Sequence, residues 1–500
     1  MAALGLSARR RALDPGDIRA RDKIACDPAL AGALVRVYPR APMTAGLRQL
    51  LTLAWPIVLA RSAQAAIGFA DAAMIAYLGQ DALAATTTGA LNTFGLMILP
   101  MGIVFIVQSF AAQLVGQKDI GGARRYAWYG LLLAAVTQLV AIAAIPLVAL
   151  SLAQLNYTPA VQLLMTSYIS IRLLGIGAAV GIETLGNWYG GLGDTRLALL
   201  SNVVAMVVNI GLNWVLIYGH LGFAPMGVAG AAIASVIATW IGFIVVAAVF
   251  LRGYMPGSVG LAVVAGAGRL RWAEFTRMLR FGLPNGLNWF LEFSAFLAFI
   301  NLIFADLGTL AFAALMVVIQ VNSISFMPAF GLSSAGAILV GQAIGAGQHD
   351  LVPAIVRRTG LVAATWQGLV GIVYFLLPVP IMALFAEDKY AVSELARLGA
   401  VLLAISAAWQ LFDAAVMTIS EALRAAGDTA WVLWARVGLA WVVWLPLSLW
   451  VVYGLGGGPP AATACMLVYF VTLTAAVWWR FRSGAWRHID LTGRSDVPVV

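Results

Sequence analysis

The stretch VAGAAIASVIATWIGFIVVAAVFL, residues 228–251, contains no charged side chain and is apolar almost throughout. At about 1.5 Å per residue, a helix of this length crosses the roughly 30 Å hydrocarbon core of a bilayer. A membrane-spanning strand would alternate apolar and polar residues, whereas this run is continuous. A helix also satisfies its own backbone hydrogen bonds inside lipid. The stretch therefore predicts a transmembrane helix.

The composition of the whole chain resembles that of this stretch. Of its 500 residues, 62% are hydrophobic and only 10% are charged, and the mean hydropathy is +0.93. Soluble domains carry about a quarter charged residues. These values exclude water-soluble enzymes, disordered regulators and secreted disulfide scaffolds. The two cysteines, Cys26 and Cys465, lie in a polar tail and in an apolar run, so no disulfide framework is expected.

Apolar runs of similar length recur along the chain, and we predict an all-α membrane protein with twelve transmembrane helices. The predicted spans are 48–78, 83–115, 125–153, 162–190, 196–218, 228–251, 276–305, 309–340, 354–385, 391–425, 430–453 and 460–482. The predicted organisation is a cytosolic N-terminal tail (1–44), a first six-helix lobe (45–252), a cytosolic connector (253–272), a second six-helix lobe (273–482) and a cytosolic C-terminal tail (483–500).

Basic residues orient these spans, because cytoplasmic loops hold the excess of Lys and Arg. The chain has 30 Lys and Arg against 21 Asp and Glu, a net charge of +9. With the N-terminus in the cytosol, all but four of the basic residues fall on the cytosolic side, Arg424 and Arg436 among them. The four are Arg61 and Arg172 inside spans, and Lys389 and Arg397 in an outer connection. We therefore expect both termini in the cytoplasm. The expected location is a bacterial-type plasma (inner) membrane.

The two halves of the chain carry matching landmarks at a near-constant offset. They are Pro56 and Pro284, 228 apart; Pro100 and Pro328, also 228 apart; LVGQ at 114–117 and 339–342, 225 apart; and Gly-Asp-Thr at 193–195 and 427–429, 234 apart. Since each half has six helices, the copies enter the membrane in the same direction. Two parallel lobes with a cleft between them are the architecture of a secondary transporter.

The sequence also limits the energy source. The three lysines, Lys23, Lys118 and Lys389, each follow a residue other than glycine, so no Walker A loop is available to bind ATP. The histidines, His220, His349 and His488, are isolated, which excludes a His-Glu-x-x-His metalloprotease motif. We therefore expect a transporter driven by an ion gradient and not an enzyme, with no cofactor other than Na+ or H+ as coupling ion.

Acidic residues inside the spans are the expected coupling groups: Asp71, Glu183, Glu292, Asp413 and Glu421. Each opposes insertion by roughly 2.5–3.5 kcal/mol, so such residues usually face an internal cavity, although pairing between helices is the alternative at each position. Glu292 and Asp413 both lie roughly 16–18 Å from the cytoplasmic face. Two carboxylates at one depth can share a cation or a proton.

The other acids have polar neighbours in the sequence. Asp71 lies at a depth similar to that of Asn209 and Asn213, and the three can hold a proton or a hydrated cation; alternatively, the asparagines only join helices. Glu183 and Arg172 share a helix face and are expected to belong to a structural ionic network. Glu421 is expected to pair with Arg424, whose side chain reaches toward the inner boundary.

Several short motifs make the chain resemble the multidrug and toxic compound extrusion (MATE) family, in its NorM-like branch. The motifs are Trp55-Pro56 followed by Asp71 and Leu78-Gly79; Gly193-Asp194-Thr195; Asn209-Ile210-Gly211-Leu212-Asn213; Gly227-Val228-Ala229-Gly230-Ala231-Ala232; Gly282-Leu283-Pro284 with Glu292; Leu339-Val340-Gly341-Gln342 with Gly345; and Gln410-Leu411-Phe412-Asp413-Ala414. The resemblance covers about residues 45–482. It implies a twelve-helix, V-shaped antiporter in which inward Na+ or H+ drives the export of organic cations and drugs.

The resemblance also implies roles for particular residues. Asp71, Asn209 and Asn213 match the family's polar cluster in the first lobe, and Glu292 and Asp413 match the cation site of this branch, where Na+ would bind. Two positions depart from the family. Asn213 stands where another branch has an acid, and Trp409 stands where a tyrosine is expected.

Aromatic residues beside the acids are the expected contacts for flat cationic substrates. They are Trp289, Phe290, Phe293 and Trp409. The expected partners are small organic cations and the lipid bilayer, without nucleic acid, and the chain is expected to be a monomer. The alternative function is a flippase for lipid-linked oligosaccharides, which needs a strongly cationic cavity. The sequence offers only Arg61 and Arg172 as bases within the membrane.

Overall fold

The structure is a computed structural model that describes residues 46–154, 157–254, 270–385 and 394–493. Within these ranges all regular structure is helical. The predicted N-terminal tail, most of the connector between the lobes and the end of the predicted C-terminal tail lie outside the described residues.

The helices of the first lobe follow the predicted spans, with two breaks. They are α3 (Leu47–Ile75), η1 (Ala76–Leu78), α4 (Gln80–Phe105), α5 (Val107–Gly116), α6 (Ile120–Leu152), α7 (Pro159–Leu173), α8 (Ile176–Gly191), α9 (Arg196–Tyr218) and α10 (Gly227–Leu251). The predicted span 162–190 is a pair of helices, α7 and α8, bent by 45°. At the bend, Leu174 and Gly175 donate to carbonyls three residues back, the tighter pattern that closes helix ends.

The second lobe has longer helices and several π-helical turns. Its elements are α11 (Trp272–Phe299), η2 (Ile300–Phe304), α12 (Thr309–Gly345), η3 (His349–Leu351), α13 (Val352–Leu376), α14 (Pro378–Ala383), α15 (Glu394–Ala426), α16 (Thr429–Gly438), η4 (Leu439–Trp444), α17 (Leu445–Leu449), η5 (Trp450–Gly454), α18 (Pro459–Arg482) and η6 (Ala485–His488). Elements α16 to η5 form one span, in which π-helical turns flank the proline-containing α17. Proline has no backbone donor, so the helical hydrogen bonds shift around it.

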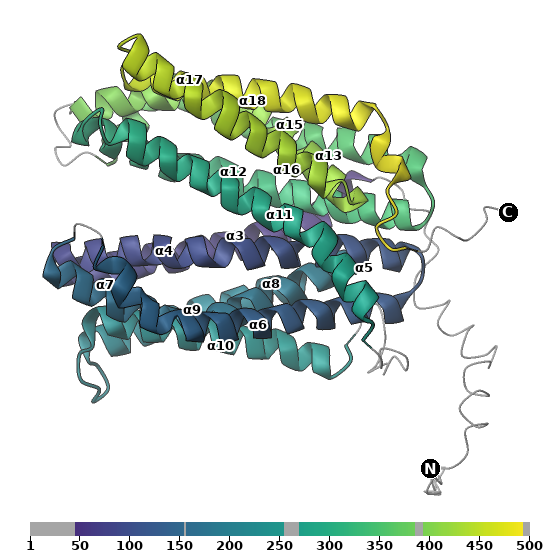
Figure 1. Ribbon diagram of the computed structural model, residues 1–500, viewed down its shortest axis with the longest axis horizontal. Coiled ribbons are helices and arrows are strands. Elements are labelled where there is room, and N and C mark those ends of the chain that lie inside the picture. Colours follow the sequence, from purple (N-terminus) through teal and green to yellow (C-terminus); the bar gives the residue numbers. More distant parts are fainter. Residues whose placement is uncertain (1–45, 155–156, 255–269, 386–393, 494–500) are drawn as a thin grey trace, which may run out of the picture.

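The helix count agrees with the prediction of twelve spans. Across the described ranges, 11 helices are long and apolar enough to cross a membrane, and the bent pair α7–α8 makes up to 12. Figure 1 shows α3 to α10 in one bundle, coloured purple to blue-green, and most of α11 to α18 in a second bundle, coloured teal to yellow. The predicted all-α, two-lobed membrane fold is confirmed.

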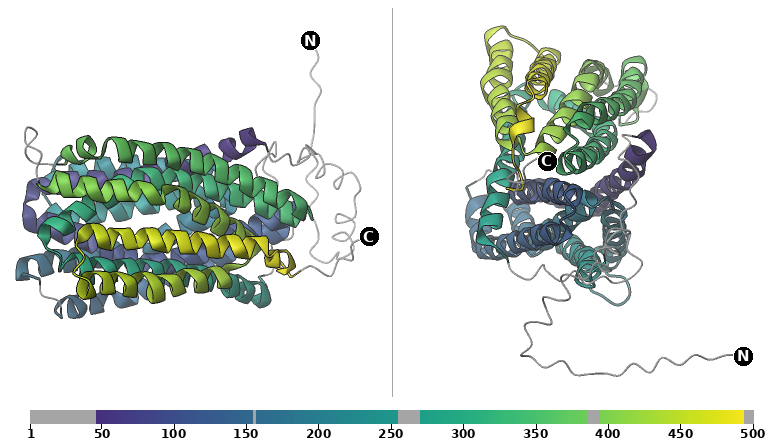
Figure 2. Two further views of the ribbon diagram at one scale, coloured as in Figure 1. Left: turned by 90° about the horizontal axis from the view of Figure 1, so that it is seen from above. Right: turned by 90° about the vertical axis from the view of Figure 1, so that its right-hand side faces the viewer.

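The first helix of each lobe reaches across to the other lobe. α11 packs on α4, and α3 and α5 pack on α12; in Figure 1, α11 runs diagonally toward the lower bundle, and Figure 2 shows the two bundles end on. Leu50 and Leu53 of α3 belong to the apolar core of the second lobe, while Met278 of α11 belongs to a core of the first lobe. This exchange joins the lobes without merging their cores.

The LVGQ and Gly-Asp-Thr landmarks gather at one end of the molecule, where α5 and α12 end beside each other. Gln342 Nε2 of the second LVGQ motif donates to Gly191 O, two residues before the first Gly-Asp-Thr motif, at 3.0 Å. The glycines of the two Gly-Asp-Thr turns, Gly193 and Gly427, have φ values of 93° and 95°. A side chain disfavours this left-handed conformation, which explains the glycine in both copies. We name this end of the molecule the LVGQ end.

Candidate functional site

A buried polar cluster joins three helices of the first lobe, far from the LVGQ end. Asp71 of α3 accepts hydrogen bonds from Asn213 Nδ2 of α9 at 2.5 Å and from Ser235 Oγ of α10 at 3.2 Å. Asn209 lies one turn before Asn213, accepts from its amide at 3.3 Å and donates to Ser235 Oγ at 3.1 Å. Asp71 is 9% exposed and the other three side chains are at most 2% exposed. The three residues singled out in the sequence thus lie together.

Ser235 completes this cluster and was not predicted from the sequence. It stands in the apolar stretch 228–251, where one serine among alanines and glycines resembles ordinary close packing between membrane helices. Asn213 Oδ1 is buried without a hydrogen-bond partner. An acceptor without a partner is costly in a buried site. The cluster therefore keeps one unused hydrogen-bond acceptor.

A second polar group in the first lobe is an ion pair between α3 and α8. Arg61 contacts Glu183 through two hydrogen bonds of 2.7 and 3.0 Å. Gln64 Nε2 also donates to Glu183 Oε1, at 3.3 Å, and to Asn202 Oδ1, at 3.1 Å. The predicted pairing of Glu183 with Arg172 is wrong: Arg172 precedes the bend between α7 and α8 and instead interacts electrostatically with Asp71.

The second-lobe acids lie in different hydrogen-bonding environments. Glu292 of α11 forms an ion pair with Arg436 of α16, with 2.7 Å between Oε2 and Nη1, and accepts from the Tyr469 hydroxyl at 3.1 Å. Asp413 of α15 accepts from Gln367 Nε2 of α13 at 2.8 Å. Electrostatic interactions link Asp413 with both Glu292 and Arg436. The assignment of Arg436 to a cytosolic connection is wrong, because its side chain is only 16% exposed within a membrane helix.

This environment does not fit a sodium ion at Glu292. Sodium, like other hard cations, binds through several oxygen ligands, whereas both Glu292 oxygens already face donors, and one donor carries a positive charge. The described ranges also contain no group of three or more His, Cys, Asp and Glu side chains that could hold a metal ion. The sodium site at Glu292 and Asp413 stays a prediction from the family resemblance.

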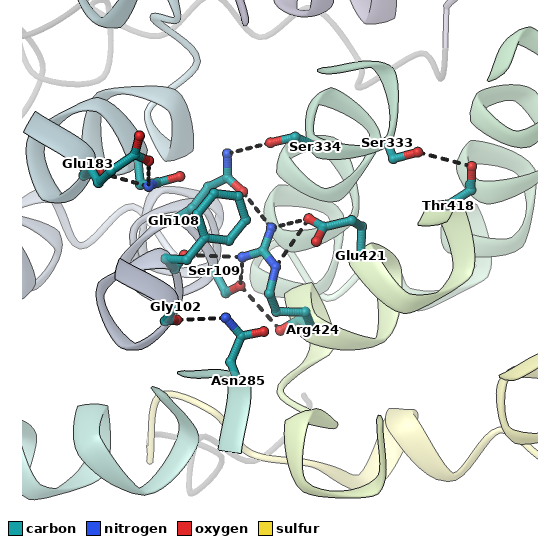
Figure 3. Close-up of polar contacts among 12 residues, drawn as sticks. Gly102, Gln108, Ser109, Glu183, Asn285, Ser333, Ser334, Thr418, Glu421 and Arg424 are labelled. Atoms are coloured by element: carbon teal, nitrogen blue, oxygen red, sulfur yellow. Dashed lines mark hydrogen bonds and ion pairs between the residues drawn. The ribbon is translucent and has the colours of Figure 1, made fainter. Parts of the chain in front are cut away.

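Arg424 of α15 forms the main polar contact between the lobes at the LVGQ end (Figure 3). Its guanidinium donates to Gln108 Oε1 at 2.7 Å and to Ser109 Oγ at 3.1 Å, both on α5. It also pairs with Glu421 and lies 4.4 Å from the centre of the Phe105 ring. The predicted pair with Glu421 is confirmed, but Arg424 is only 3% exposed. Its side chain is enclosed between the lobes and does not reach the boundary.

The LVGQ motifs provide the close packing around this contact. A side-chain carbon on Gly116 would meet the Gln342 carbonyl oxygen of the second motif, and one on Gly345 would meet the Gln113 carbonyl oxygen of α5. Backbones can approach this closely only through glycine. The repeated motif, recognised in the sequence only as a landmark, is thus a contact surface between the two lobes.

A small cavity lies in the first lobe next to the Arg61–Glu183 pair, with Ser334 of the second lobe at its edge. It has a volume of about 40 Å³ and is lined among others by Gln108, Asn202 and Ser334. Gln108 Nε2 donates to Ser334 Oγ of the second lobe at 3.1 Å. A space of this size holds little more than a water molecule. The Gln108–Ser334 hydrogen bond joins the two lobes beside this cavity.

The predicted aromatic residues lie in three different places. Trp289 and Phe293 line the lobe interface, with ring centres 5.0 Å from Phe105 and 5.6 Å from Phe94, respectively. Phe290 is 38% exposed. Trp409 is buried in the second lobe and stacks on Phe470 at 5.8 Å.

Two duplicated helical lobes with acids buried in each define a membrane transporter. The MatE family model matches residues 56–215 and 284–450, which together form more than half of the chain. The chain belongs to this family, and it is a transporter and not an enzyme. The matched segments begin at Pro56 and Pro284, the prolines paired in the sequence.

Similar proteins span nearly the whole chain. The probable multidrug resistance protein NorM of Chromobacterium violaceum is 30% identical over 82% of this chain and 87% of its own length. The probable multidrug resistance protein NorM of Thermotoga maritima is 27% identical over 90% of this chain and 95% of its own length. The fold matches a MATE crystal structure in complex with MaL6, with a TM-score of 0.79 and 19% sequence identity. The match covers 88% of this chain and 97% of that chain. The structure of an outward-facing MATE family transporter of the MOP superfamily gives a TM-score of 0.79 with 19% sequence identity. That match covers 88% of this chain and 96% of that chain.

Proposed function

We propose that this transporter is a multidrug antiporter that exports small organic cations in exchange for inward protons. It acts as a monomer in a bacterial inner membrane, with both termini in the cytoplasm. The names of its NorM relatives support drug export. The observation that carries the coupling is the buried Asp71 cluster.

The distribution of basic residues supports the orientation. Arg124, Arg125, Arg277, Arg357 and Arg480 all lie near the LVGQ end of their helices. Because cytoplasmic surfaces hold the excess of Lys and Arg, this end faces the cytosol. The Asp71 cluster, at the other end of α3, is then closer to the outer face, where protons enter.

Asp71 suits a proton better than sodium because both neighbours, the Asn213 amide and the Ser235 hydroxyl, direct hydrogen-bond donors toward its carboxylate. On protonation, the Asp71 hydroxyl becomes a donor and needs an acceptor. Rotation of the Asn213 amide would present Oδ1, which is now without a partner, and the Ser235 hydroxyl either donates or accepts. The cluster can therefore satisfy both charge states of Asp71, and exchange between them would rearrange α3, α9 and α10.

The driving force follows from the charges exchanged. One proton entering for one monovalent drug leaving moves no net charge, so the membrane potential, worth roughly 2.3 kcal/mol per 100 mV per charge, would contribute nothing. The pH gradient alone, roughly 1.4 kcal/mol per unit, would drive export. With two protons per drug, the potential would add to it.

The lobe interface supports an organic cation as substrate. Trp289 and Phe293 offer ring faces there, and separation of the lobes would expose them. The flippase alternative needs unpaired positive charge, yet Arg61, Arg424 and Arg436 each pair with an acid. The expectation that only Arg61 and Arg172 are bases within the membrane is wrong, since Arg436 also lies within a membrane-spanning helix.

Transport in proteoliposomes tests this function. Vesicles with an imposed pH gradient and equal sodium on both sides should move a fluorescent organic cation against its gradient, and the Asp71→Asn chain should not. Transport that requires a sodium gradient would reject proton coupling. Loss of transport under both gradients would reject antiport.

A further inference from the structure

The ion pair between Glu292 and Arg436 has an uncharged counterpart in the first lobe. When the two repeats are aligned on the paired prolines, Glu292 corresponds to Gln64, because each pair is separated by 228 residues. When they are aligned on the Gly-Asp-Thr motifs, Arg436 corresponds to Asn202, because each pair is separated by 234 residues. Gln64 and Asn202 are hydrogen-bonded to each other at 3.1 Å, as Glu292 and Arg436 are at 2.7 Å. The same contact thus occurs in both lobes, as an amide pair in one and as an ion pair in the other.

This correspondence indicates that the two charges act as a unit. A guanidinium within a membrane helix is expensive to bury without a partner. Arg436 Nη1 reaches Glu292, Nη2 reaches only the Ser420 hydroxyl, at 3.4 Å, and the buried Nε has no partner. The compensation for burying Arg436 therefore comes chiefly from Glu292 and, at longer range, from Asp413.

We propose that Arg436 is a built-in cation of the second lobe that occupies the position of a bound sodium ion and so excludes sodium from this lobe. Its positive charge neutralises Glu292, and its N–H groups offer a metal ion no ligand. A second cation beside the guanidinium would be repelled. Arg436 thereby determines ion specificity, and the proton remains as the coupling ion. This inference rests on the proposed antiport.

Binding of radiolabelled sodium to the purified full-length chain tests the proposal. At about pH 8.5, well above the usual carboxyl range, wild type should show no saturable binding that depends on Asp413. Arg436→Asn introduces the residue of the first lobe and leaves Glu292 and Asp413 without their cation. This variant should gain saturable binding of about one sodium ion per chain, because the two acids then need a mobile cation and at this pH sodium is far more abundant than protons.

Two matched variants identify the site. Glu292→Gln/Arg436→Asn recreates the amide pair of the first lobe and should bind no sodium, and Asp413→Asn added to Arg436→Asn should abolish the gained binding. Saturable sodium binding by wild type that Asp413→Asn removes would overturn the proposal, as would a folded Arg436→Asn chain that binds none. If the Arg436→Asn chain does not stay monodisperse, the comparison of wild type with Asp413→Asn decides the question. Sodium binding by wild type that depends on Asp413 overturns the proposal, and the absence of such binding supports it. Because no drug is present, failure of this proposal is distinguishable from failure of drug antiport.

Discussion

Arg424 Nη2 of the second lobe lies 2.7 Å from Gln108 Oε1 of the first, which joins residues 316 positions apart in the chain. The same guanidinium reaches the Phe105 carbonyl at 3.2 Å and the Ser109 hydroxyl at 3.1 Å. These acceptors follow one another around the junction of α4 and α5. One side chain therefore supplies several of the hydrogen bonds that join the lobes at the LVGQ end.

Replacing Arg424 by Gln should loosen this end. A hydrogen bond to a buried charged group contributes about 1.5–3 kcal/mol, and 1.4 kcal/mol changes an equilibrium constant about tenfold. We expect a cysteine at position 334, in a chain without Cys26 and Cys465, to react with an impermeant maleimide about tenfold faster in Arg424→Gln, in vesicles with the LVGQ end outward. Arg357→Gln removes an exposed arginine at the same end and should leave the labelling rate unchanged. Equal labelling rates in the parent chain, Arg424→Gln and Arg357→Gln would show that Arg424 does not keep the lobes in contact at this end.

Asp71→Asn should abolish uphill export while preserving the fold. The amide is nearly isosteric and keeps hydrogen-bonding capacity toward Asn213 and Ser235, but it cannot change charge. We expect loss of pH-driven accumulation and retention of drug binding, measured by fluorescence anisotropy. Asp81→Asn, an exposed carboxylate in the first turn of α4, should transport normally. Uphill transport by Asp71→Asn would place the coupling proton elsewhere.

Much of this cluster was predictable from the sequence, and the reason is physical. An aspartate or asparagine in an apolar span stands out, and helix rise converts its position into depth. Asp71, Asn209 and Asn213 therefore lie together as predicted. Ser235 gave no such signal, because serine is common between membrane helices.

The partners of the charged residues were less predictable. Spacing along one helix suggested Arg172 for Glu183, but a bend lies between them and Arg61 of another helix is the partner. Arg436 was assigned to the cytosol because basic residues near span ends usually belong there. Aligning the repeats would have shown that Glu292 and Arg436 replace an amide pair. That alignment is the signal in the sequence that could have revealed the ion pair.

The Arg61–Glu183 pair should behave as a structural unit. Removing one partner leaves a charge in a largely buried site, which costs about 3–5 kcal/mol, so Arg61→Gln and Glu183→Gln should each lower the unfolding temperature in detergent. The double variant replaces both charges and should recover much of the loss, a coupling that a double-mutant cycle measures. Additive losses would mean that the two side chains do not interact in the folded protein.

Alanine substitutions of the four aromatic residues should have different effects, depending on where each ring lies. Trp289→Ala and Phe293→Ala remove rings at the lobe interface and should change which drugs are exported, with several-fold changes in efflux for flat cations. Phe290→Ala removes a partly exposed ring and tests whether the substrate route includes this position. Trp409→Ala should instead lower stability by about 3–5 kcal/mol, because it empties a buried volume. An unchanged drug spectrum in Trp289→Ala and Phe293→Ala would remove the lobe interface from the substrate pathway.

Gly345→Ala should prevent the LVGQ end from closing. The added methyl group would overlap the Gln113 carbonyl of the other lobe, and relieving such overpacking typically costs about 1–3 kcal/mol. Since the clash exists only while the lobes touch, the equilibrium should shift toward lobes separated at this end, and labelling of a cysteine at position 334 should become faster. Gly211→Ala is the matched control, because a methyl group there meets no atom within 4 Å and a helical alanine is favoured over glycine. If Gly345→Ala and Gly211→Ala label alike, contact between the repeated motifs does not control access to the interface.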